Sequence, residues 1–431
     1  MIGFAGLSHL GLVSAIAAAS KGLDVVGFDT DGALAAAIDR GELPVFEPGL
    51  AELFDENRGR LRFTGDAADL SACDLVVFAR DVATDDRGES DLGPLRALIN
   101  AVVPHIRPGS VPVVLSQVPP GFTRGLGREP ASGAAGRPLE WYYQVETLIF
   151  GRAVERALRP ERFIVGCADP AGPLPAAFRR FLEAFDCPIL PMRYESAELT
   201  KIAINMCLVS SVSVANTLAE LCEAIGADWA EMVPALKLDR RIGQSAYLAA
   251  GLGLSGGNLE RDLATVRGLS RRYGTDAGVV DAWLVNSAHR RDWALRRLHS
   301  EVLACTADPV VAIWGLAYKP DTHSTKNSPA LALLDALGPL AARVHDPQVV
   351  LGPREGGRVV QVHNPLEACR GADALVVATP WPAYAAIDHR AIRVALRGRV
   401  VIDPFGALSL AGTGLVHHRL GRPVLAEESP A

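Results

Sequence analysis

The segment from Glu195 to Ile225 runs for 31 residues without a proline or a glycine. These two residues most readily interrupt a helix, so their absence predicts one long helix of about 45 Å. Gly226 follows at the position where a helix commonly ends. A helix of this length can connect two domains and line the contact between two copies of the chain, and we expect it to do both.

Short β-branched runs alternate with helical patterns on both sides of this segment. Before it, the runs read IGFA, DVVGFD, LRFTG, CDLVVFA, SVPVVLS, LEWYYQ, RFIVGC and CPILPM. After about residue 305 the pattern resumes with DPVVAIWGLAYKP, RVHDP, ADALVVATP and GRVVIDPFG. Such alternation predicts parallel sheets flanked by helices. The Gly- and Pro-rich segment from Thr123 to Glu140 is expected to be a loop.

A chain of 431 residues is too long for one hydrophobic core and is expected to divide into domains. We predict an α/β protein in which two doubly wound, Rossmann-like domains are joined by the long central helix, itself part of a helical dimerisation domain. The expected boundaries are residues 1–192 for the first Rossmann domain, 193–300 for the helical domain and 301–431 for the second Rossmann domain.

The charge balance favours a small-molecule ligand. The net charge is -6 and both signs are mixed along the chain, which predicts no nucleic-acid partner and no membrane partner. The apolar N-terminus has no charged leader and is typical of a strand, turn and helix, and no run reaches about 18 uninterrupted apolar residues, so we expect no membrane segment. The seven cysteines lack Cys-x-x-Cys spacing, which suits reduced thiols in a cytoplasm and predicts no metal site.

The stretch GFAGLSHLG follows an expected strand and opens an expected helix, with Gly6, Ser8 and Gly11 where a dinucleotide-binding turn has three glycines. Gly6 allows the tight turn and Gly11 lets the helix approach the strand, whereas Ser8 crowds the phosphates or donates a hydrogen bond to them. Asp29 ends the second strand 18 residues after Gly11, where a carboxylate binds ribose hydroxyls and repels a 2′-phosphate. The pattern predicts NAD as cofactor. The alternative is a phosphate-free turn with a solvent-exposed aspartate.

Further motifs occur in an order that resembles one enzyme family over nearly the whole chain. They are GELPVFEPGL (41–50), RIGQSAYL (241–248), GLAYKPDT (315–322), NSPALALL, VHDP and ATPWPAY. In order and spacing they are similar to the UDP-glucose/GDP-mannose 6-dehydrogenase family. The resemblance implies an N-terminal NAD domain, a central domain that makes a homodimer, and a C-terminal domain that closes on a nucleotide sugar.

The resemblance implies a chemistry that this sequence alters at one position. Members of the family oxidise a primary alcohol at sugar C6 twice, using two NAD, through a thiohemiacetal and a thioester on a cysteine. The segment GLSGGNLERD (253–262) resembles the loop that carries this cysteine and has Asn258 in its place. A carboxamide is not a useful nucleophile, so no acyl enzyme forms on Asn258 and the second oxidation loses its route.

The other catalytic positions are kept. Lys201 and Asn205 are four residues apart and share one face of the expected helix. The resemblance implies that these two residues and Asp262 hold the reacting oxygen and a water and take the proton, with Lys201 as an acceptor or as a charge that stabilises an alkoxide. Glu146 matches the first of two family glutamates and is expected to be a base through water. With Asn258, these residues form the predicted catalytic set.

The resemblance also implies contacts to the cofactor. Beside the glycine turn these are His9, Leu10, Val82 and Gln117. His9 replaces an aromatic residue beside the pyrophosphate, and we interpret it as a spacer first and a phosphate donor second. Val82 and Gln117 each stand where the family has a threonine.

Substrate contacts follow from the same resemblance. Arg241 is expected to reach the sugar or phosphate from the other subunit, and Tyr318 and Lys319 are expected to flank the nucleotide. The remaining predicted substrate contacts are Tyr247, Gly253, Gly256 and Gly257.

Four functions are compatible with these residues. The first is one two-electron oxidation of an alcohol on a UDP- or GDP-linked sugar to a ketone or an aldehyde, in the biosynthesis of aminosugars such as those of antibiotics. The second is an epimerase that oxidises and re-reduces one carbon with tightly bound NAD. The third is a four-electron 6-dehydrogenase in which Asp262 or Glu146 activates a gem-diol. The fourth is an inactive binding homologue. We expect the first.

Overall fold

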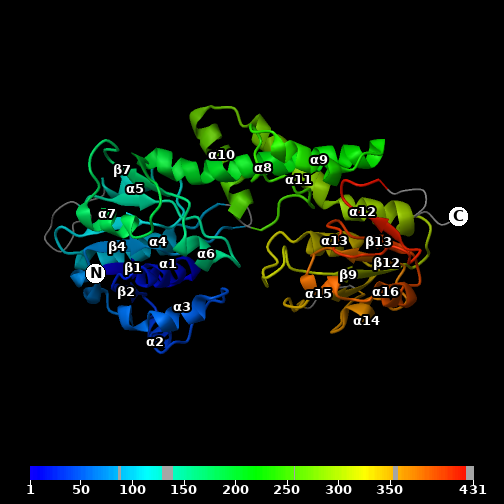
Figure 1. The fold of residues 1–431 in the computed structure, drawn as a ribbon, viewed down its shortest axis with the longest axis horizontal. Helices are drawn as coiled ribbons and strands as arrows, with labels where there is room; N and C mark the ends of the chain where they lie inside the picture. The colour runs from blue at the N-terminus through cyan, green and yellow to red at the C-terminus, as the bar shows by residue number, and fades with distance from the viewer. Residues whose placement is uncertain (86–88, 129–138, 257, 353–357, 424–431) are drawn as a thin grey trace. The chain divides into compact units, whose positions relative to one another are not determined.

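Two β-sheets organise the chain in a computed structural model that describes residues 1–85, 89–128, 139–256, 258–352 and 358–423 (Figure 1). The chain divides into two compact units, Met1–Ile204 and Asn205–Ala431. Each unit has its own sheet and its own hydrophobic core. The α/β prediction is therefore confirmed, whereas the domain boundaries at 192/193 and 300/301 stay a prediction.

The sheet of the first unit has the strand order β3-β2-β1-β4-β5-β6-β7-β8. Its strands are β1 (Ile2–Ala5), β2 (Val25–Phe28), β3 (Leu61–Thr64), β4 (Leu75–Phe78), β5 (Val111–Val114), β6 (Tyr142–Gln144), β7 (Phe163–Cys167) and β8 (Ile189–Arg193). Each predicted run contains one of these strands. The first six have the order 3-2-1-4-5-6 of a doubly wound dinucleotide-binding fold.

The prediction of an all-parallel sheet is wrong at one pair, because β7 runs antiparallel to β6. A parallel neighbour needs a crossover that returns the chain to the opposite end of the sheet. The connection here carries only the short helix α6 (Ala153–Leu158), which packs on α1 (His9–Ser20). The chain therefore enters β7 at the end where it left β6, and the amide of Val145 donates to Ile164 (3.0 Å) to continue the antiparallel ladder.

Helices cover both faces of this sheet. Besides α1 and α6 they are α2 (Gly32–Asp39), α3 (Leu50–Glu56), α4 (Gly93–Val102), α5 (Phe122–Leu126) and α7 (Ala176–Glu183), with 3-10 turns at Arg58–Arg60, Ala67–Ala72 and Val103–His105. Side chains of α1, α3 and α7 bury one face, and those of α4 and α5 bury the other. Both faces of a parallel sheet are thus apolar, as its nearly continuous hydrophobic strands require.

Helix α5 lies inside the segment that was predicted to be a loop, so that prediction is wrong for its first residues. Gly121 precedes the helix with a φ of 95°. The buried carboxylate of Glu198 accepts the amides of Gly121 (2.5 Å) and Thr123 (2.9 Å). A carboxylate at this end satisfies amides that have no partner within the helix. Residues 129–138 of the predicted loop lie outside the described residues.

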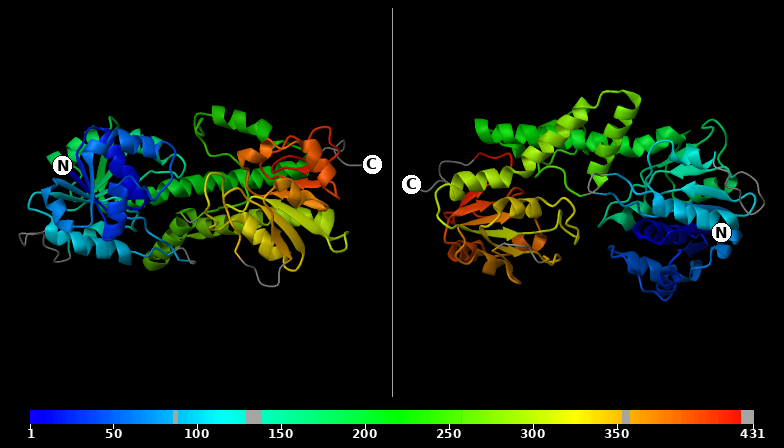
Figure 2. Two further views of the ribbon diagram at one scale, coloured as in Figure 1. Left: turned by 90° about the horizontal axis from the view of Figure 1, so that it is seen from below. Right: turned by 180° about the vertical axis from the view of Figure 1, so that it is seen from behind.

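The predicted long helix is confirmed as α8 (Tyr194–Ile225), which both views of Figure 2 show as one continuous helix. It begins one residue before the prediction and ends at Ile225, directly before Gly226, whose φ is 82°. The division between the two units falls inside it, after Ile204. Among the described residues it is also the one helix long and apolar enough to cross a membrane, a test that core helices of soluble proteins pass as well.

The second unit begins with the rest of α8 and four further helices. They are α9 (Trp229–Leu238), α10 (Asn258–Tyr273), α11 (Gly278–Arg291) and α12 (Trp293–Leu298), with a π-helical turn at His299–Leu303. Its sheet has the strands β9 (Val310–Trp314), β10 (Ala341–His345), β11 (Val359–Gln361), β12 (Ala374–Val377), β13 (Val400–Ile402) and β14 (Val416–His418).

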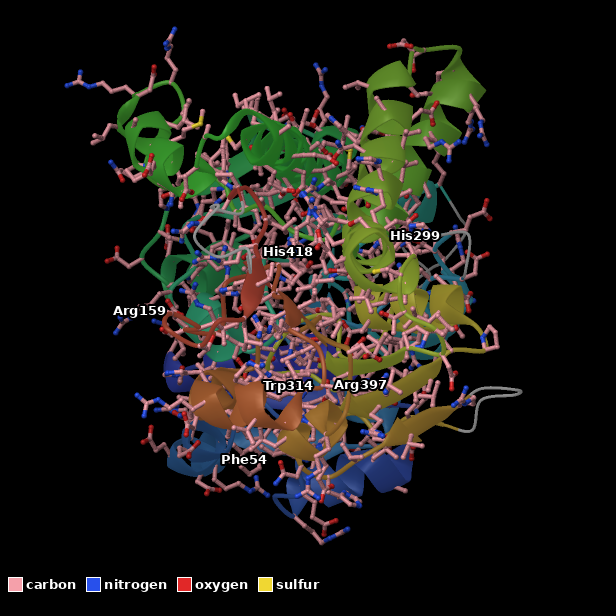
Figure 3. All side chains as sticks on the ribbon, turned by 90° about the vertical axis from the view of Figure 1, so that its right-hand side faces the viewer. Phe54, Arg159, His299, Trp314, Arg397 and His418 are labelled. Atoms are coloured by element: carbon pink, nitrogen blue, oxygen red, sulfur yellow. The ribbon has the colours of Figure 1, made fainter. Side chains whose placement is uncertain are left out.

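This second sheet is parallel throughout and has the order β11-β10-β9-β12-β13-β14, again 3-2-1-4-5-6. Its remaining helices are α13 (Pro329–Leu337), α14 (Pro365–Cys369), α15 (Pro382–Ala385) and α16 (His389–Ala395). Trp314, labelled in Figure 3, is fully buried at the end of β9, and its indole nitrogen donates to Pro365 (2.9 Å). Two doubly wound sheets in one chain confirm the predicted fold class.

Candidate active site

The glycine turn at the N-terminus has the backbone that its sequence requires. Gly6 has a φ of 94°, a conformation that side chains rarely adopt. A Cβ atom on Gly11 would lie 1.8 Å from the carbonyl oxygen of Gly6. Glycine is therefore obligatory at position 11 for α1 to begin this close to β1. The turn is of the kind that binds a dinucleotide, because its glycines let the backbone come close to a pyrophosphate at the N-terminus of α1.

The predicted cofactor residues lie at one edge of the first sheet. Gly6 follows β1, Asp29 follows β2, Val82 lies beyond β4 and Gln117 lies beyond β5. The carboxyl ends of parallel strands meet at the same edge, which is where doubly wound sheets bind their ligands. Val82 is half-buried and packs on the core of this unit, and Gln117 is also half-buried.

Asp29 is buried and its carboxylate is turned toward the glycine turn. It accepts the amide of Leu7 (2.8 Å) on one oxygen and the amide of Asp31 (3.0 Å) on the other. The Thr30 hydroxyl also donates to Asp29 (3.4 Å). A carboxylate has about four acceptor positions, so these three bonds leave one for a ribose hydroxyl. The alternative of a solvent-exposed aspartate is thus wrong.

Ser8 and Asp81 close the N-terminus of α1. The Ser8 hydroxyl accepts the amide of Asp81 (2.9 Å) and donates to the carbonyl of Ala79 (3.4 Å). The Asp81 carboxylate in turn accepts the amide of Leu10 (3.3 Å). Ser8 therefore ties the turn to the end of β4 in this structure. Asp81, which sequence reasoning missed, places a negative charge where a pyrophosphate is expected.

His9 is held by a carboxylate from a different part of the chain. Its Nε2 donates to Glu47 (2.8 Å), and its ring packs on Phe150 with the centroids 4.3 Å apart. Glu47 is buried and also accepts the amides of Gly151 (3.0 Å) and Ala153 (3.2 Å). His9 thus contacts two segments that lie far from it in the sequence, and its role beside the pyrophosphate stays a prediction. Glu47 belongs to the motif at 41–50, but nothing local in the sequence indicates its partners.

Glu146 and Lys201 form an ion pair. The distance between Glu146 Oε1 and Lys201 Nζ is 2.6 Å, and the two side chains are only 16% and 13% exposed. The second carboxylate oxygen of Glu146 accepts the amide of Leu148 (3.0 Å). The sequence predicted both residues but not their direct contact. The pair places a carboxylate and an ammonium group side by side.

Asn205 and Asp262 form a second buried pair. The Asn205 amide donates to Asp262 Oδ2 (2.5 Å), and both side chains are buried. The buried guanidinium of Arg261 lies 3.4 Å from the other oxygen of Asp262. Arg261 therefore compensates the charge that burial would otherwise make costly. Asn205 is one turn beyond Lys201 on α8, so the helix brings both predicted residues to one face.

The loop before α10 is fixed by side chains from α8 and α11. The amide of Gly251 donates to Asn216 (2.8 Å), and the amide of Leu254 donates to Ser287 (2.8 Å). Gly253 has a φ of 79°, and a Cβ there would lie 2.4 Å from the carbonyl oxygen of Ser287. Asn258 is the first residue of α10 and its side chain is exposed. Gly257 lies outside the described residues.

The predicted nucleotide contacts lie after β9. Lys319 Nζ is 5.8 Å from the centre of the Tyr318 ring, a cation–π contact. Burial raises the pKa of the Tyr318 hydroxyl, so this group stays neutral. A Cβ on Gly256 would lie 3.1 Å from this ring. The structure thus brings together Tyr318, Lys319 and Gly256, three of the predicted substrate contacts.

The second unit repeats the polar pattern of the cofactor turn. Gly315 follows β9 with a φ of 93°, like Gly6 after β1. Asp346 follows β10 and accepts the amides of Leu316 (2.6 Å) and Ala317 (3.0 Å), as Asp29 accepts that of Leu7. The C-terminal unit therefore has a turn of the kind that binds phosphate groups.

Two predicted substrate contacts are not held in a site within this chain. Arg241 is exposed and its guanidinium pairs with Asp239 two residues away (3.0 and 2.7 Å), which raises the pKa of Arg241. Tyr247 is also exposed. Both remain available for contact with another molecule. In the described part of the chain no group of His, Cys, Asp and Glu side chains could hold a metal ion.

Comparison with known proteins accounts for nearly the entire chain. Models of the UDP-glucose/GDP-mannose dehydrogenase family match its NAD binding domain at residues 1–182, its central domain at 195–288 and its UDP binding domain at 312–409. UDP-glucose 6-dehydrogenase AglM of Haloferax volcanii is 32% identical over 414 residues, which is 92% of this chain and 95% of the relative.

Two solved structures also match nearly the whole chain. A UDP-glucose dehydrogenase from Pyrobaculum islandicum is 30% identical with a TM-score of 0.82 and covers 93% of either chain. A UDP-D-ManNAc dehydrogenase from Pyrococcus horikoshii has a TM-score of 0.84 at 23% identity and covers 99% of this chain and 100% of its own, which shows a shared fold.

Proposed function

We propose, since the chain belongs to the UDP-glucose/GDP-mannose dehydrogenase family, that it oxidises one alcohol of a UDP-linked sugar to a carbonyl and stops there. Membership makes the protein an NAD-dependent oxidoreductase of nucleotide sugars. The finer proposal concerns how many hydrides leave the sugar. The observation that carries it is the residue at position 258.

Asn258 stands at the position where the resemblance places the nucleophile of the second oxidation. Its carboxamide is exposed at the first residue of α10, so it is accessible but not nucleophilic. A thiohemiacetal cannot form on it. The aldehyde or ketone from the first oxidation therefore has no covalent route to a thioester.

Three of the cysteines are unsuited to replace the missing thiol. Burial raises the pKa of Cys73 to about 11 and of Cys369 to about 12, so these thiols stay protonated and unreactive. Cys207 is exposed on α8, but it is two residues from Asn205 and so lies about 200° around the helix from it. A thiol on that face does not share the side of α8 that carries Lys201 and Asn205.

The partly buried Glu146–Lys201 pair and the buried Asn205–Asp262 pair each supply groups that one oxidation needs. When bound, NAD accepts the hydride that leaves the carbinol carbon with its electron pair. The hydroxyl proton must leave the oxygen bonded to that carbon, and the Glu146–Lys201 pair provides a carboxylate acceptor and an ammonium that stabilises the developing alkoxide. The Asn205 amide and the Asp262 carboxylate provide a donor and an acceptor for positioning the oxygen or a water.

We further propose that the protein is a homodimer built on α8. Val214, Leu221 and Ile225 are more than half exposed and recur at a spacing of seven and four residues, so they form one apolar stripe. A stripe of this kind on a helix that is only partly buried favours a second copy as its cover. Arg241, exposed and held by Asp239, would then be available to the partner's site. We also propose that the protein is cytoplasmic and that its carbonyl product is the substrate of a later transamination.

The test is a count of reduced cofactor per sugar. The protein is incubated with NAD and a panel of UDP-, GDP- and dTDP-sugars, and the product is identified by mass. One NADH per sugar and a carbonyl that reacts with hydroxylamine are expected. Two NADH per sugar and a carboxylate would refute the proposal. Altered sugar with no NADH would instead indicate an epimerase.

A substitution at position 258 sharpens this test. Asn258→Cys is expected to allow some acid formation, with more than one NADH per sugar, if the loop is otherwise competent. Asn258→Ser is the matched control, because it changes size similarly without giving a thiolate. Equal stoichiometry in all three proteins would mean that residue 258 does not decide the oxidation level.

A further inference from the structure

Asn327 joins the loop that carries Asn258 to the loop that is expected to hold the nucleotide. Its side-chain amide donates to the carbonyl of Gly256 (3.0 Å) and to the carboxylate of Glu260. The amide of Gly256 donates to the carbonyl of Lys326 (3.1 Å). Both backbone groups of Gly256 and the first turn of α10 are therefore held by two consecutive residues.

Tyr318 makes a further contact between the same two loops. Its ring packs so closely on Gly256 that a Cβ there would approach to 3.1 Å, and Gly256 has a φ of 80°. The amide of Tyr318 donates to the carbonyl of Ser324 (3.1 Å), which closes a loop from residue 318 to residue 324. The Tyr318 ring therefore leaves no room for a side chain at position 256, and it cannot move further toward Gly256 without displacing that residue.

Glu260 sits in a site that suits a hydrogen-bonded carboxyl group. Burial raises its pKa, and the charges of Lys326 and of Arg291 on α11 oppose that rise. The donor from Asn327 offsets part of the desolvation that burial costs. Asn327 has a φ of 52°, which asparagine tolerates better than most residues. The backbone at 327 is thus adapted to deliver this side chain.

We propose that Glu260 and Asn327 are positioning residues that form a latch, through which a nucleotide bound at Tyr318 and Lys319 fixes the loop carrying Asn258. The expected effect of the latch on turnover rests on the proposed function. The contacts that form the latch all lie within the second unit and do not depend on which reaction is catalysed. The chemical class of the ligand that closes it is a uridine diphosphate, the part of the substrate that the matched C-terminal family domain binds.

The first measurement is hydrogen exchange with UDP as the probe, because it needs no turnover. In the unaltered protein, UDP is expected to slow exchange in residues 251–256 and 259–262. Asn327→Gly removes the side chain while keeping the left-handed backbone, and it is expected to abolish that protection. Protection that survives in this variant, or that is absent in the unaltered protein, would overturn the latch.

The second measurement is kinetic. Glu260→Ala and Asn327→Gly are each expected to lower kcat about 10- to 100-fold, since a loop misplaced by about 1 Å costs that much, with little change in the Kd of UDP. The double variant should be no slower than the worse single variant, because both substitutions break the same contact between Asn327 and Glu260. Glu260→Gln keeps an acceptor and should retain most activity. Glu231→Ala, at an exposed position on α9, is the matched control.

Effects that multiply in the double variant, or an equal loss in Glu260→Gln, would refute a shared positioning role. Failure of the proposed function is seen separately. If the unaltered protein oxidises no sugar but UDP still protects the loop and Asn327→Gly removes that protection, then the latch stands and the proposed reaction falls.

Discussion

The carboxylate of Asp81 repels the pyrophosphate of NAD, although the glycine turn beside it suits that ligand. This carboxylate accepts the amide of Leu10 at 3.3 Å and so occupies the N-terminus of α1, where the glycine turn leaves room for a pyrophosphate. Replacing Asp81 with asparagine keeps an acceptor for that amide but removes the charge. We expect Asp81→Asn to bind NAD more tightly than the unaltered protein does.

The magnitude follows from two terms. A carboxylate at a helix N-terminus stabilises the folded protein by about 0.3–1 kcal/mol. The unaltered protein loses this stabilisation when a phosphate displaces Asp81. A displaced but nearby carboxylate still repels a phosphate by about 1 kcal/mol at a separation of about 4 Å in water. Together they give about 1–2 kcal/mol, which corresponds to a Kd for NAD that is about 5- to 30-fold lower.

Calorimetric titration of NAD at low and high salt measures both terms. The increase in NAD affinity of Asp81→Asn over the unaltered protein should become smaller as salt is added, because the charge of Asp81 is exposed to solvent. Asp24→Asn is the control, since Asp24 loses the same charge at the opposite end of β2, where it pairs with Arg60. An unchanged or higher Kd in Asp81→Asn, or an equal gain in Asp24→Asn, would show that the reasoning about the helix end is wrong.

Further predictions concern stability, catalysis, assembly and pH. Gly11→Ala should fail to bind NAD and should lower the melting temperature markedly, because its Cβ would overlap the Gly6 carbonyl. Glu146→Gln should lower kcat about 100- to 10,000-fold in the NADH assay while leaving the Kd of NAD unchanged; a small effect would exclude Glu146 as the base. Leu221→Arg should give a monomer in light scattering without loss of helix content, whereas a persistent dimer would point to another interface. Glu260 has a folded pKa above its ordinary value of 4.5, so its contribution to the unfolding free energy is complete below that value and is lost as the pH rises through the folded pKa. Urea unfolding of Glu260→Gln across this range should lack that decline, and matching curves would contradict it.

Local patterns were sufficient to predict most of the fold. All eight strands of the first sheet, four of the six strands of the second and α8 to within one residue follow from periodicity and from where glycine and proline occur, whereas β11 (Val359–Gln361) and β14 (Val416–His418) were not predicted. The glycine turn could also be predicted, because the approach of α1 to β1 excludes any side chain at position 11. These features depend on residues that are neighbours in the sequence or on one repeating pattern.

The features that could not be predicted depend on distant partners. The direction of β7 is set by how a short helix packs on α1, and the start of α5 is set by Glu198, 75 residues further along the chain. A run of β-branched residues reads the same in either direction. Glu198 appears in the sequence only as one more charged residue in a long helix.

In the site, too, the features that could not be predicted are those that depend on partners distant in the sequence. Lys201 and Asn205 are found by their spacing on a helix, but the contact of Glu146 with Lys201 joins residues from different elements. Asn327 and Glu260 lie in two of the quoted motifs, but they are 67 residues apart and neither motif indicates that they are in contact. A glutamate paired with an asparagine gives no pattern in a single sequence, because either residue alone is common on surfaces.

The position of the boundary between the two units, inside α8 after Ile204, has a practical consequence. Each half, expressed separately, would start or stop in the middle of a hydrogen-bonded turn and would leave four amides or four carbonyls without partners at the cut. Genetic truncation at that point should therefore give two fragments with frayed ends. Fragments that keep the whole of α8 on one side are the better choice for studying either half.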